Sequence, residues 1–391
     1  MTAFRAACGS TWGGRRDSMA SPEAPVGWVM LLSLCIACSA AFPLHSQGIS
    51  LHEVHRLRGS EFVLDPIVVA TVGPNGQIWA SQPRDGAIVG LLPGETRVRW
   101  IGRRGEGPGD LQGVAQIYQR GDSIWLVDLG LRRVTKYRTD GRVISTVTLR
   151  PPAGMVGAFL QASTPNGVSW WRGRVEGATQ LTVMVAQPDG AGAKRVELDE
   201  ATECYVSMAM PNGGSLSRLI PYCHTSMHAY SSNGMFRVSA YPKSGYGATA
   251  EVAVSVRSLD GGMHLSRTVS VPAALIPSTV RDSAIRRLFE GVSPRQQELA
   301  QEMVRHQLVP EIWSPLVSVA VSDHGDVLLV VRDGSHTDVK GILLRRGESR
   351  MRTLPFDSTQ RLRWFGGSHV LLVSDDPDGV EDAVLYRMTP D

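Results

Sequence analysis

Clusters of charge of one sign are missing from this sequence. The net charge is only +3, and the basic residues are scattered apart from short pairs such as Arg103-Arg104 and Arg132-Arg133. A nucleic-acid-binding surface needs lysine and arginine gathered on one face, so we expect no nucleic-acid partner. Aromatic residues are also few, at 6%, but 42% of the residues are hydrophobic, which excludes a disordered chain.

Recognised catalytic motifs are missing as well. The chain contains neither the H-E-x-x-H motif of zinc proteases nor the G-x-S-x-G nucleophile elbow of hydrolases. Residues of the types that bind metals are spread along the chain and form no motif; they are His224, His228, His324, His336 and Asp128. We therefore predict no metal site and no cofactor, and a divalent ion such as calcium is the alternative. The acidic run 375–379 lacks the alternating frame of a calcium loop and predicts a turn between the last two strands.

Cysteine is scarce in the body of the chain. After the N-terminal region, which holds three cysteines, only Cys204 and Cys223 occur. Two cysteines that flank a turn-rich segment in an otherwise cysteine-free body suit an oxidising compartment. We predict that they form a disulfide, which would close a loop of about 20 residues. Two buried free thiols are the alternative.

The N-terminal region predicts export. Val26–Phe42 is an apolar run of about 15 residues, which is short for a membrane-spanning helix and suits the hydrophobic region of a signal peptide. The pair Arg15-Arg16 supplies a positively charged flank, and this favours a start at Met1 over a start at Met19.

Residues 1–45 are therefore expected to be a leader outside the folded domain. The mature protein is expected to be periplasmic, secreted or attached to the outer membrane. Lipidation of Cys35 or Cys38, or retention of an uncleaved signal, would be its contact with a membrane.

Beyond this leader one pattern recurs along the chain. Val69–Leu92 and Gln116–Val147 each contain an apolar strand, a Gly-centred turn, an Ile-Trp strand, a polar loop and a further alternating strand. Comparable units follow at Phe159–Leu198, Tyr205–Val271, Leu316–Leu354 and Arg361–Met388. Strand-turn-strand units at a spacing of about 35–45 residues predict the four-stranded blades of a propeller.

The sequence thus predicts an all-β protein, a six-bladed β-propeller over residues 50–391. An unpartnered strand within Glu53–Phe62 is expected to close the ring by joining the last blade. Tyr205–Val271 fits the pattern least well, so the blade boundaries between residues 199 and 277 stay open. Trp79, Trp125 and Trp170 recur at one repeat position, which predicts that they pack between blades.

A short helical insert is predicted between the fourth and fifth blades, at about residues 278–309. Its apolar residues recur at helical spacing, and Ser293-Pro294 suits the start of a second helix. The insert would pack on the rim of the propeller or, alternatively, form a lid over the central opening.

The connection Ile101–Val114 reads IGRRGEGPGDLQGV and crosses from the first repeat to the second. Its glycines permit backbone angles that other residues avoid, and it lacks the G-x-G-x-x-G spacing and the following helix of a nucleotide-binding loop. One interpretation is a structural crossover stabilised by ion pairs. The other is a ligand site at the channel mouth, built from Arg103, Arg104, Glu106 and Asp110.

A resemblance to known proteins is carried by four segments: Ile101–Gln112, Ser123–Tyr137, the segment VPEIWSPLVSVAVSDHGDVLLV after the helical insert, and the final VLYRM. Together they resemble the secreted six-bladed β-propellers related to NHL-repeat proteins. The resemblance covers about residues 53–391, and it implies an exported bacterial protein with this fold. It implies little about function, because one fold serves many functions.

The leading functional hypothesis is a non-catalytic binding or scaffold protein, acting as a monomer on an unidentified protein, glycan or small molecule. The alternative is a metal-dependent hydrolase, similar to the lactonases among six-bladed propellers, with its site in the central channel.

Overall fold

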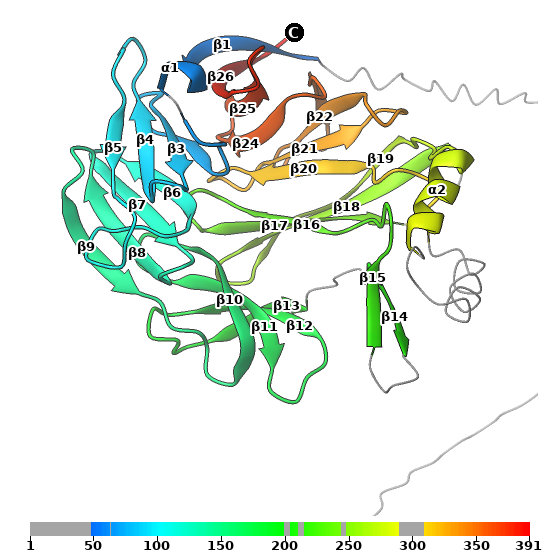
Figure 1. Cartoon of the computed structure of the whole chain (residues 1–391), viewed down its shortest axis with the longest axis horizontal. Helices are drawn as coiled ribbons and strands as arrows, with labels where there is room; N and C mark the ends of the chain where they lie inside the picture. Colours follow the sequence, from blue (N-terminus) through cyan, green and yellow to red (C-terminus); the bar gives the residue numbers. More distant parts are fainter. Residues whose placement is uncertain (1–47, 63, 199–203, 210–214, 244–247, 289–308) are drawn as a thin grey trace, which may run out of the picture. The chain divides into compact units, whose positions relative to one another are not determined.

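The structure is a computed structural model that describes residues 48–62, 64–198, 204–209, 215–243, 248–288 and 309–391. The predicted leader, residues 1–45, and the predicted second helix at Ser293 lie outside these ranges. The described part is all-β apart from two helices, and six four-stranded antiparallel sheets form the blades of a propeller (Figure 1). The predicted fold is confirmed.

Three blades follow one another along the first half of the chain. The first contains β2 (Ala70–Val72), β3 (Ile78–Gln82), β4 (Ala87–Leu91) and β5 (Arg99–Ile101). The next contains β6 (Val114–Arg120), β7 (Ser123–Asp128), β8 (Arg133–Arg138) and β9 (Val143–Thr148). The third contains β10 (Met155–Ser163), β11 (Ser169–Val175), β12 (Leu181–Ala186) and β13 (Lys194–Leu198).

The second half contributes the remaining blades. One contains β16 (Met227–Tyr230), β17 (Phe236–Lys243), β18 (Thr249–Ser258) and β19 (Met263–Pro272). Another contains β20 (Leu316–Val321), β21 (Val327–Arg332), β22 (Val339–Leu344) and β23 (Met351–Pro355). The last contains β24 (Arg361–Phe365), β25 (His369–Asp375), β26 (Glu381–Pro390) and the N-terminal strand β1 (Ile49–Leu57).

The two ends of the described chain close the ring. Strand β1 pairs antiparallel with β26, with Ile49 opposite Pro390 and Leu57 opposite Ala383 (Figure 1). After β1, the short helix α1 (Gly59–Phe62) is fixed by Asp382, whose carboxylate accepts a hydrogen bond from the Gly59 amide. The predicted ring closure is confirmed, although the closing strand begins earlier than expected and ends before α1.

The fourth predicted repeat, Tyr205–Val271, divides into two parts. A separate two-stranded hairpin, β14 (Tyr205–Ala209) and β15 (Ser215–Leu219), precedes the blade that begins at β16. Both strands of the hairpin belong to no four-stranded sheet, so the blade itself is shorter than the repeat that the pattern suggested.

The helix α2 (Ser278–Leu288) lies between β19 and β20, at the edge of the ring in Figure 1. When the blades are numbered by the position of their first strand in the chain, the blade that contains β1 is the first blade. In this numbering α2 lies between the fifth and sixth blades. The predicted position was therefore slightly off, because the repeat pattern was counted from the blade of β2. Within the predicted insert, residues 289–308 lie outside the described ranges.

In the described ranges the hydrophobic core is divided into six clusters, and each lies between two neighbouring blades. Trp79 and Trp170 are fully buried and donate hydrogen bonds to the next blade, Trp79 to Gln119 (2.7 Å) and Trp170 to the Gly234 carbonyl (2.8 Å). Trp125 is half-buried in the cluster between the second and third of the blades described above. These contacts confirm that the recurring tryptophans pack between blades.

Candidate functional site

The Gly-rich crossover between β5 and β6 folds back on itself. The Leu111 amide donates to the Arg103 carbonyl at 2.7 Å, and the Asp110 amide donates to the Gly107 carbonyl at 3.1 Å. Gly109 has φ of 80°, and a Cβ there would lie 2.5 Å from a methyl group of Val143. Glycine is required at this position because any side chain would be strained and would collide with β9.

Asp110 closes the loop from inside. Its carboxylate accepts hydrogen bonds from Arg103 Nε at 2.8 Å and from the Gly107 amide at 2.9 Å. The hydrogen bond from Arg103, followed by that from Gly107, lowers the pKa of Asp110 below its ordinary value. Asp110 is therefore an internal clamp of the loop.

The neighbouring strand β8 holds the loop from outside. Arg133 donates to the carbonyls of Gly107 (2.8 Å) and Asp110 (2.6 Å), and the Tyr137 hydroxyl donates to the Gly109 carbonyl (2.9 Å). Burial raises the pKa of Tyr137 to about 12, so this hydroxyl keeps its proton and remains a donor.

Asp128, which was considered as a metal-binding candidate from the sequence, stabilises the fold. Its carboxylate is fully buried and accepts three backbone hydrogen bonds, from Gln112 (2.7 Å), Gly113 (3.2 Å) and Leu131 (3.0 Å). These bonds join the end of the crossover to the turn after β7. The carboxylate satisfies buried donors that would otherwise lack partners.

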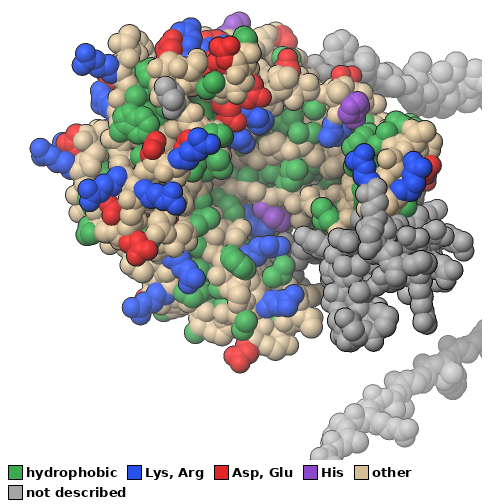
Figure 2. All heavy atoms as spheres, viewed as in Figure 1, with side chains coloured by type: hydrophobic (Ala, Val, Ile, Leu, Met, Phe, Trp, Pro, Cys, Tyr) green, Lys and Arg blue, Asp and Glu red, His purple; other side chains and the backbone are tan. Residues whose placement is uncertain are grey.

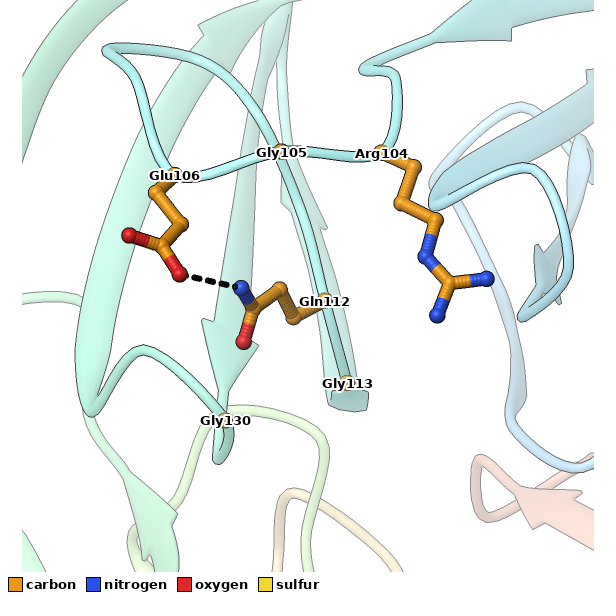
Figure 3. A pocket seen from close by; sticks show the side chains of 6 residues that line it. All are labelled: Arg104, Gly105, Glu106, Gln112, Gly113 and Gly130. Carbon is orange, nitrogen blue, oxygen red and sulfur yellow. Dashed lines mark hydrogen bonds between the residues drawn. The ribbon is translucent and has the colours of Figure 1, made fainter.

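An open pocket of about 510 Å³ lies beside this crossover (Figure 3). It is lined by Arg104, Gly105, Glu106, Gln112, Gly113 and Gly130. The side chains of Glu106 and Gln112 point toward one another and share a hydrogen bond of 3.1 Å, while Arg104 extends separately (Figure 3). No ion pair or side-chain hydrogen bond joins Arg104 to another residue in the ranges that the structure describes.

The four predicted site residues thus fall into two pairs. Arg104 and Glu106 line the pocket, whereas Arg103 and Asp110 bind one another in the loop. Sequence reasoning missed Gln112 and Gly130. Gly130 follows Asp128 in the turn after β7, and the pattern gave no signal that this turn lies beside the crossover.

A second cavity, of about 130 Å³, lies at the centre of the ring. Its walls come from β2, β6, β16, β20 and β24, which start five of the six blades, and from the turn after β16. Its polar wall residues are Gln116, Tyr230, Ser232 and Arg363. In the space-filling view, Lys and Arg side chains are scattered over the visible face instead of forming one continuous patch (Figure 2).

The histidines considered at the outset make separate contacts within the fold. His224 contacts the Ile312 carbonyl (2.9 Å), His228 contacts Arg237 (2.9 Å), and His336 stacks on Trp313 with ring centroids 5.6 Å apart. His324 is exposed. In the part of the chain that the structure describes, no three His, Cys, Asp or Glu residues are grouped to share a metal ion. The acidic run at residues 375–379 forms the turn between β25 and β26, as predicted.

The predicted disulfide between Cys204 and Cys223 is present, with the Cα atoms 5.6 Å apart. It brackets the β14–β15 hairpin. Next to it, Tyr222 meets Trp313 edge to face, with ring centroids 4.6 Å apart.

Among the described residues, no helix is long and apolar enough to cross a membrane.

No protein-family profile matches this chain, and no curated protein matches it. Solved structures similar to it include a protein of Bacteroides fragilis predicted to be exported, with 12% identity and a TM-score of 0.43 over 88% of this chain and 95% of that one. A member of the DUF4221 family from Bacteroides vulgatus has 10% identity and a TM-score of 0.41 over 88% of this chain and 100% of that one.

Another similar structure is an inactive variant of virginiamycin B lyase from Staphylococcus aureus with quinupristin. It has 11% identity and a TM-score of 0.36 over 86% of this chain and 99% of that one. These likenesses concern the fold alone. The chain is a six-bladed β-propeller, and its relation to NHL-repeat proteins stays a prediction.

Proposed function

We propose that this chain is an exported, non-catalytic binding protein, acting as a monomer, whose ligand site is the pocket beside the Gly-rich crossover. The observation that carries the proposal is that Arg104 lines this pocket without an ion pair to the described residues. This exposed cation lies on a loop whose other charged contacts, Arg103 with Asp110 and Arg133 with three loop carbonyls, are made within the fold. A rigid loop that presents one unpaired cation loses little conformational entropy when it binds.

The pocket suits a ligand that carries both an anionic group and hydrogen-bond donors. Arg104 can bind a carboxylate or a sulfate through its planar fork of N–H groups, and Glu106 can accept hydrogen bonds from hydroxyl or amide groups. Its volume lies within the usual range for ligand sites. An acidic oligosaccharide or a peptide segment of a partner protein has this chemistry.

Two features support export. The apolar run near the N-terminus has the length and charge of a signal peptide, and the Cys204–Cys223 bridge suits an oxidising compartment. Periplasmic, secreted and outer-membrane-attached forms all satisfy both features.

The test is an array of short acidic peptides and acidic or neutral oligosaccharides, probed with the mature protein and two single variants. Arg104→Gln should weaken binding at least tenfold. Arg103→Gln removes the same charge one residue away, from an arginine already paired with Asp110, and should retain binding. Binding that is unchanged in Arg104→Gln contradicts the proposal. Turnover that depends on about one tightly bound calcium or zinc ion per chain would favour the hydrolase alternative instead.

A further inference from the structure

The central cavity combines apolar walls with one charged group. Fifteen residues line it, and Arg363 is the one formally charged side chain among these described lining residues. The other walls are largely aliphatic or aromatic, with Val319 on β20 and Trp364 on β24 as examples. The volume of about 130 Å³ is close to that of an apolar cavity that accommodates a ring of about six carbon atoms.

The side chains of Gln116, Tyr230 and Ser232 in the wall already make hydrogen bonds within the fold. The Gln116 side chain accepts from the Ser163 amide at 3.0 Å and donates to the Ser232 carbonyl at 2.6 Å. The Ser232 hydroxyl donates to Asp323 at 3.0 Å, and the Tyr230 hydroxyl accepts from Arg237 at 3.2 Å. These three side chains are neutral and already engaged, so none of them supplies a charge to anchor an anionic ligand.

Arg363 is placed differently. Its Nε donates to the Ile67 carbonyl at 2.8 Å, and this bond fixes the guanidinium at the cavity wall. Its two terminal nitrogens have no hydrogen bond or ion pair with any residue that the structure describes. Glu381, which acts on Arg363 at a distance, is already bound by Arg361 at 2.9 Å and by the Ile67 amide.

Partial burial of this guanidinium costs free energy. Arg363 is half-buried, and burial lowers its pKa below the ordinary value because the charged form has lost part of its hydration. A bound anion restores the lost electrostatic stabilisation. A carboxylate matches the planar fork of the guanidinium, and the apolar walls favour a short hydrocarbon tail beside it.

We infer that the central cavity binds a small monocarboxylate of about six non-hydrogen atoms, with its carboxylate on the terminal nitrogens of Arg363 and its tail against the apolar walls. This site is separate from the crossover pocket, because the two share no lining residue. The inference therefore stands or falls independently of the proposed function.

The experiment is isothermal titration calorimetry of the purified mature protein with butyrate, its neutral analogue butyramide, and inorganic phosphate. Wild-type protein should bind butyrate at least tenfold more tightly than butyramide or phosphate. Arg363→Gln should lose butyrate binding, and Arg104→Gln, in the other pocket, should retain it. Absence of butyrate binding to the wild type, or equal binding by Arg363→Gln, overturns the inference. Phosphate binding as tight as that of butyrate overturns the assignment of a carboxylate with a tail.

A second variant covers the case in which Arg363→Gln does not fold. Ala320→Leu adds bulk to the cavity wall on β20 and leaves Arg363 in place. It should lower butyrate affinity at least tenfold, and it should remove the rise in melting temperature that butyrate gives the wild-type protein. Retention of that rise in folded Ala320→Leu places butyrate elsewhere and overturns the inference.

Discussion

Two of the connections between blades are held in contrasting ways. The crossover from β5 to β6 is short, and carboxylates close it: Asp110 binds the loop from inside and Asp128 binds its final amides. The connection from β13 to β16 is longer, contains the β14–β15 hairpin, and is bracketed by the Cys204–Cys223 disulfide.

The difference follows from what each connection can bury. The short crossover lies against β8 and β9, so its backbone groups find partners on a rigid neighbour. A two-stranded hairpin on its own is marginally stable in water, and β14 and β15 pair only with each other among the described strands. A covalent bridge supplies the constraint that such an insert lacks.

The largest effect is expected from Asp128, the buried carboxylate that binds the end of the short crossover. Asp128→Ala leaves the amides of Gln112, Gly113 and Leu131 without their acceptor, and should lower the free energy of unfolding by about 4 kcal/mol, since bonds to charged groups are worth about 1.5–3 kcal/mol each and are not additive. Urea denaturation measures this loss. Asp128→Asn keeps one acceptor oxygen and should lose less, whereas equal losses would show that the carboxylate itself is unimportant.

The disulfide should contribute somewhat less. Replacing both Cys204 and Cys223 by serine should cost up to about 3 kcal/mol, as the loop-entropy relation gives for a bridge across 19 residues. The protection of backbone amides in β14 and β15 against hydrogen exchange should fall before that of the blades. Uniform loss of protection across the ring would contradict the local role assigned to the bridge.

A smaller effect is expected at the outer face of the short crossover. Tyr137→Phe removes the hydroxyl that donates to the Gly109 carbonyl and should cost about 1 kcal/mol. The fold of the blade should be unchanged, because the ring stays buried beside Ile101 and Leu111. A loss above about 3 kcal/mol, measured by the same urea method, would mean that the ring packing had also changed.

Two carboxylates extend the comparison to pH, with opposite signs. The pKa of Asp110 is lowered by Arg103 and Gly107, so its contribution to stability is present above its unfolded pKa of about 4 and is lost as the pH falls through its folded pKa. Burial raises the pKa of Asp323, which accepts from Ser232 and Asn233 in the turn after β16. Its contribution is present below the unfolded pKa and is lost as the pH rises through the folded pKa.

Asp323→Asn should therefore become more stable relative to wild type as the pH rises from about 3 to 7, and Asp110→Asn less stable over the same range. Melting temperatures of the three proteins measured across this range decide the matter. Parallel curves for Asp323→Asn and wild type would contradict the raised pKa of Asp323.

The sequence was informative where the fold repeats itself. The Gly-centred turns and the recurring tryptophans predicted the blades because every blade packs against its neighbours in the same way and therefore needs similar residues at equivalent positions. The cysteine pair was equally readable, since both partners are the last cysteines of the chain. The hairpin β14–β15 was misjudged as part of a blade because it lies within one repeat of strands and turns, and the sequence does not show which strands pair.

The crossover pocket was harder to predict from the sequence because it is formed by contacts between turns that lie apart in the chain. Arg103 and Arg104 are adjacent and chemically identical, and only the fold shows that Arg103 meets Asp110 while Arg104 faces the pocket. Asp128 is similar. Its residue type suggested metal binding, but its carboxylate accepts backbone hydrogen bonds from the end of the crossover and from the turn after β7.

The most direct test of the crossover pocket as the binding site is backbone-amide NMR of the ¹⁵N-labelled mature protein, titrated with an acidic oligosaccharide or peptide that binds in the array. The proposed function predicts that the largest shift changes occur at Gly105, Gly113 and Gly130, which line the pocket, and that Arg104→Gln abolishes them. Shift changes gathered instead around Arg363 and the central cavity, and unaltered in Arg104→Gln, would contradict it.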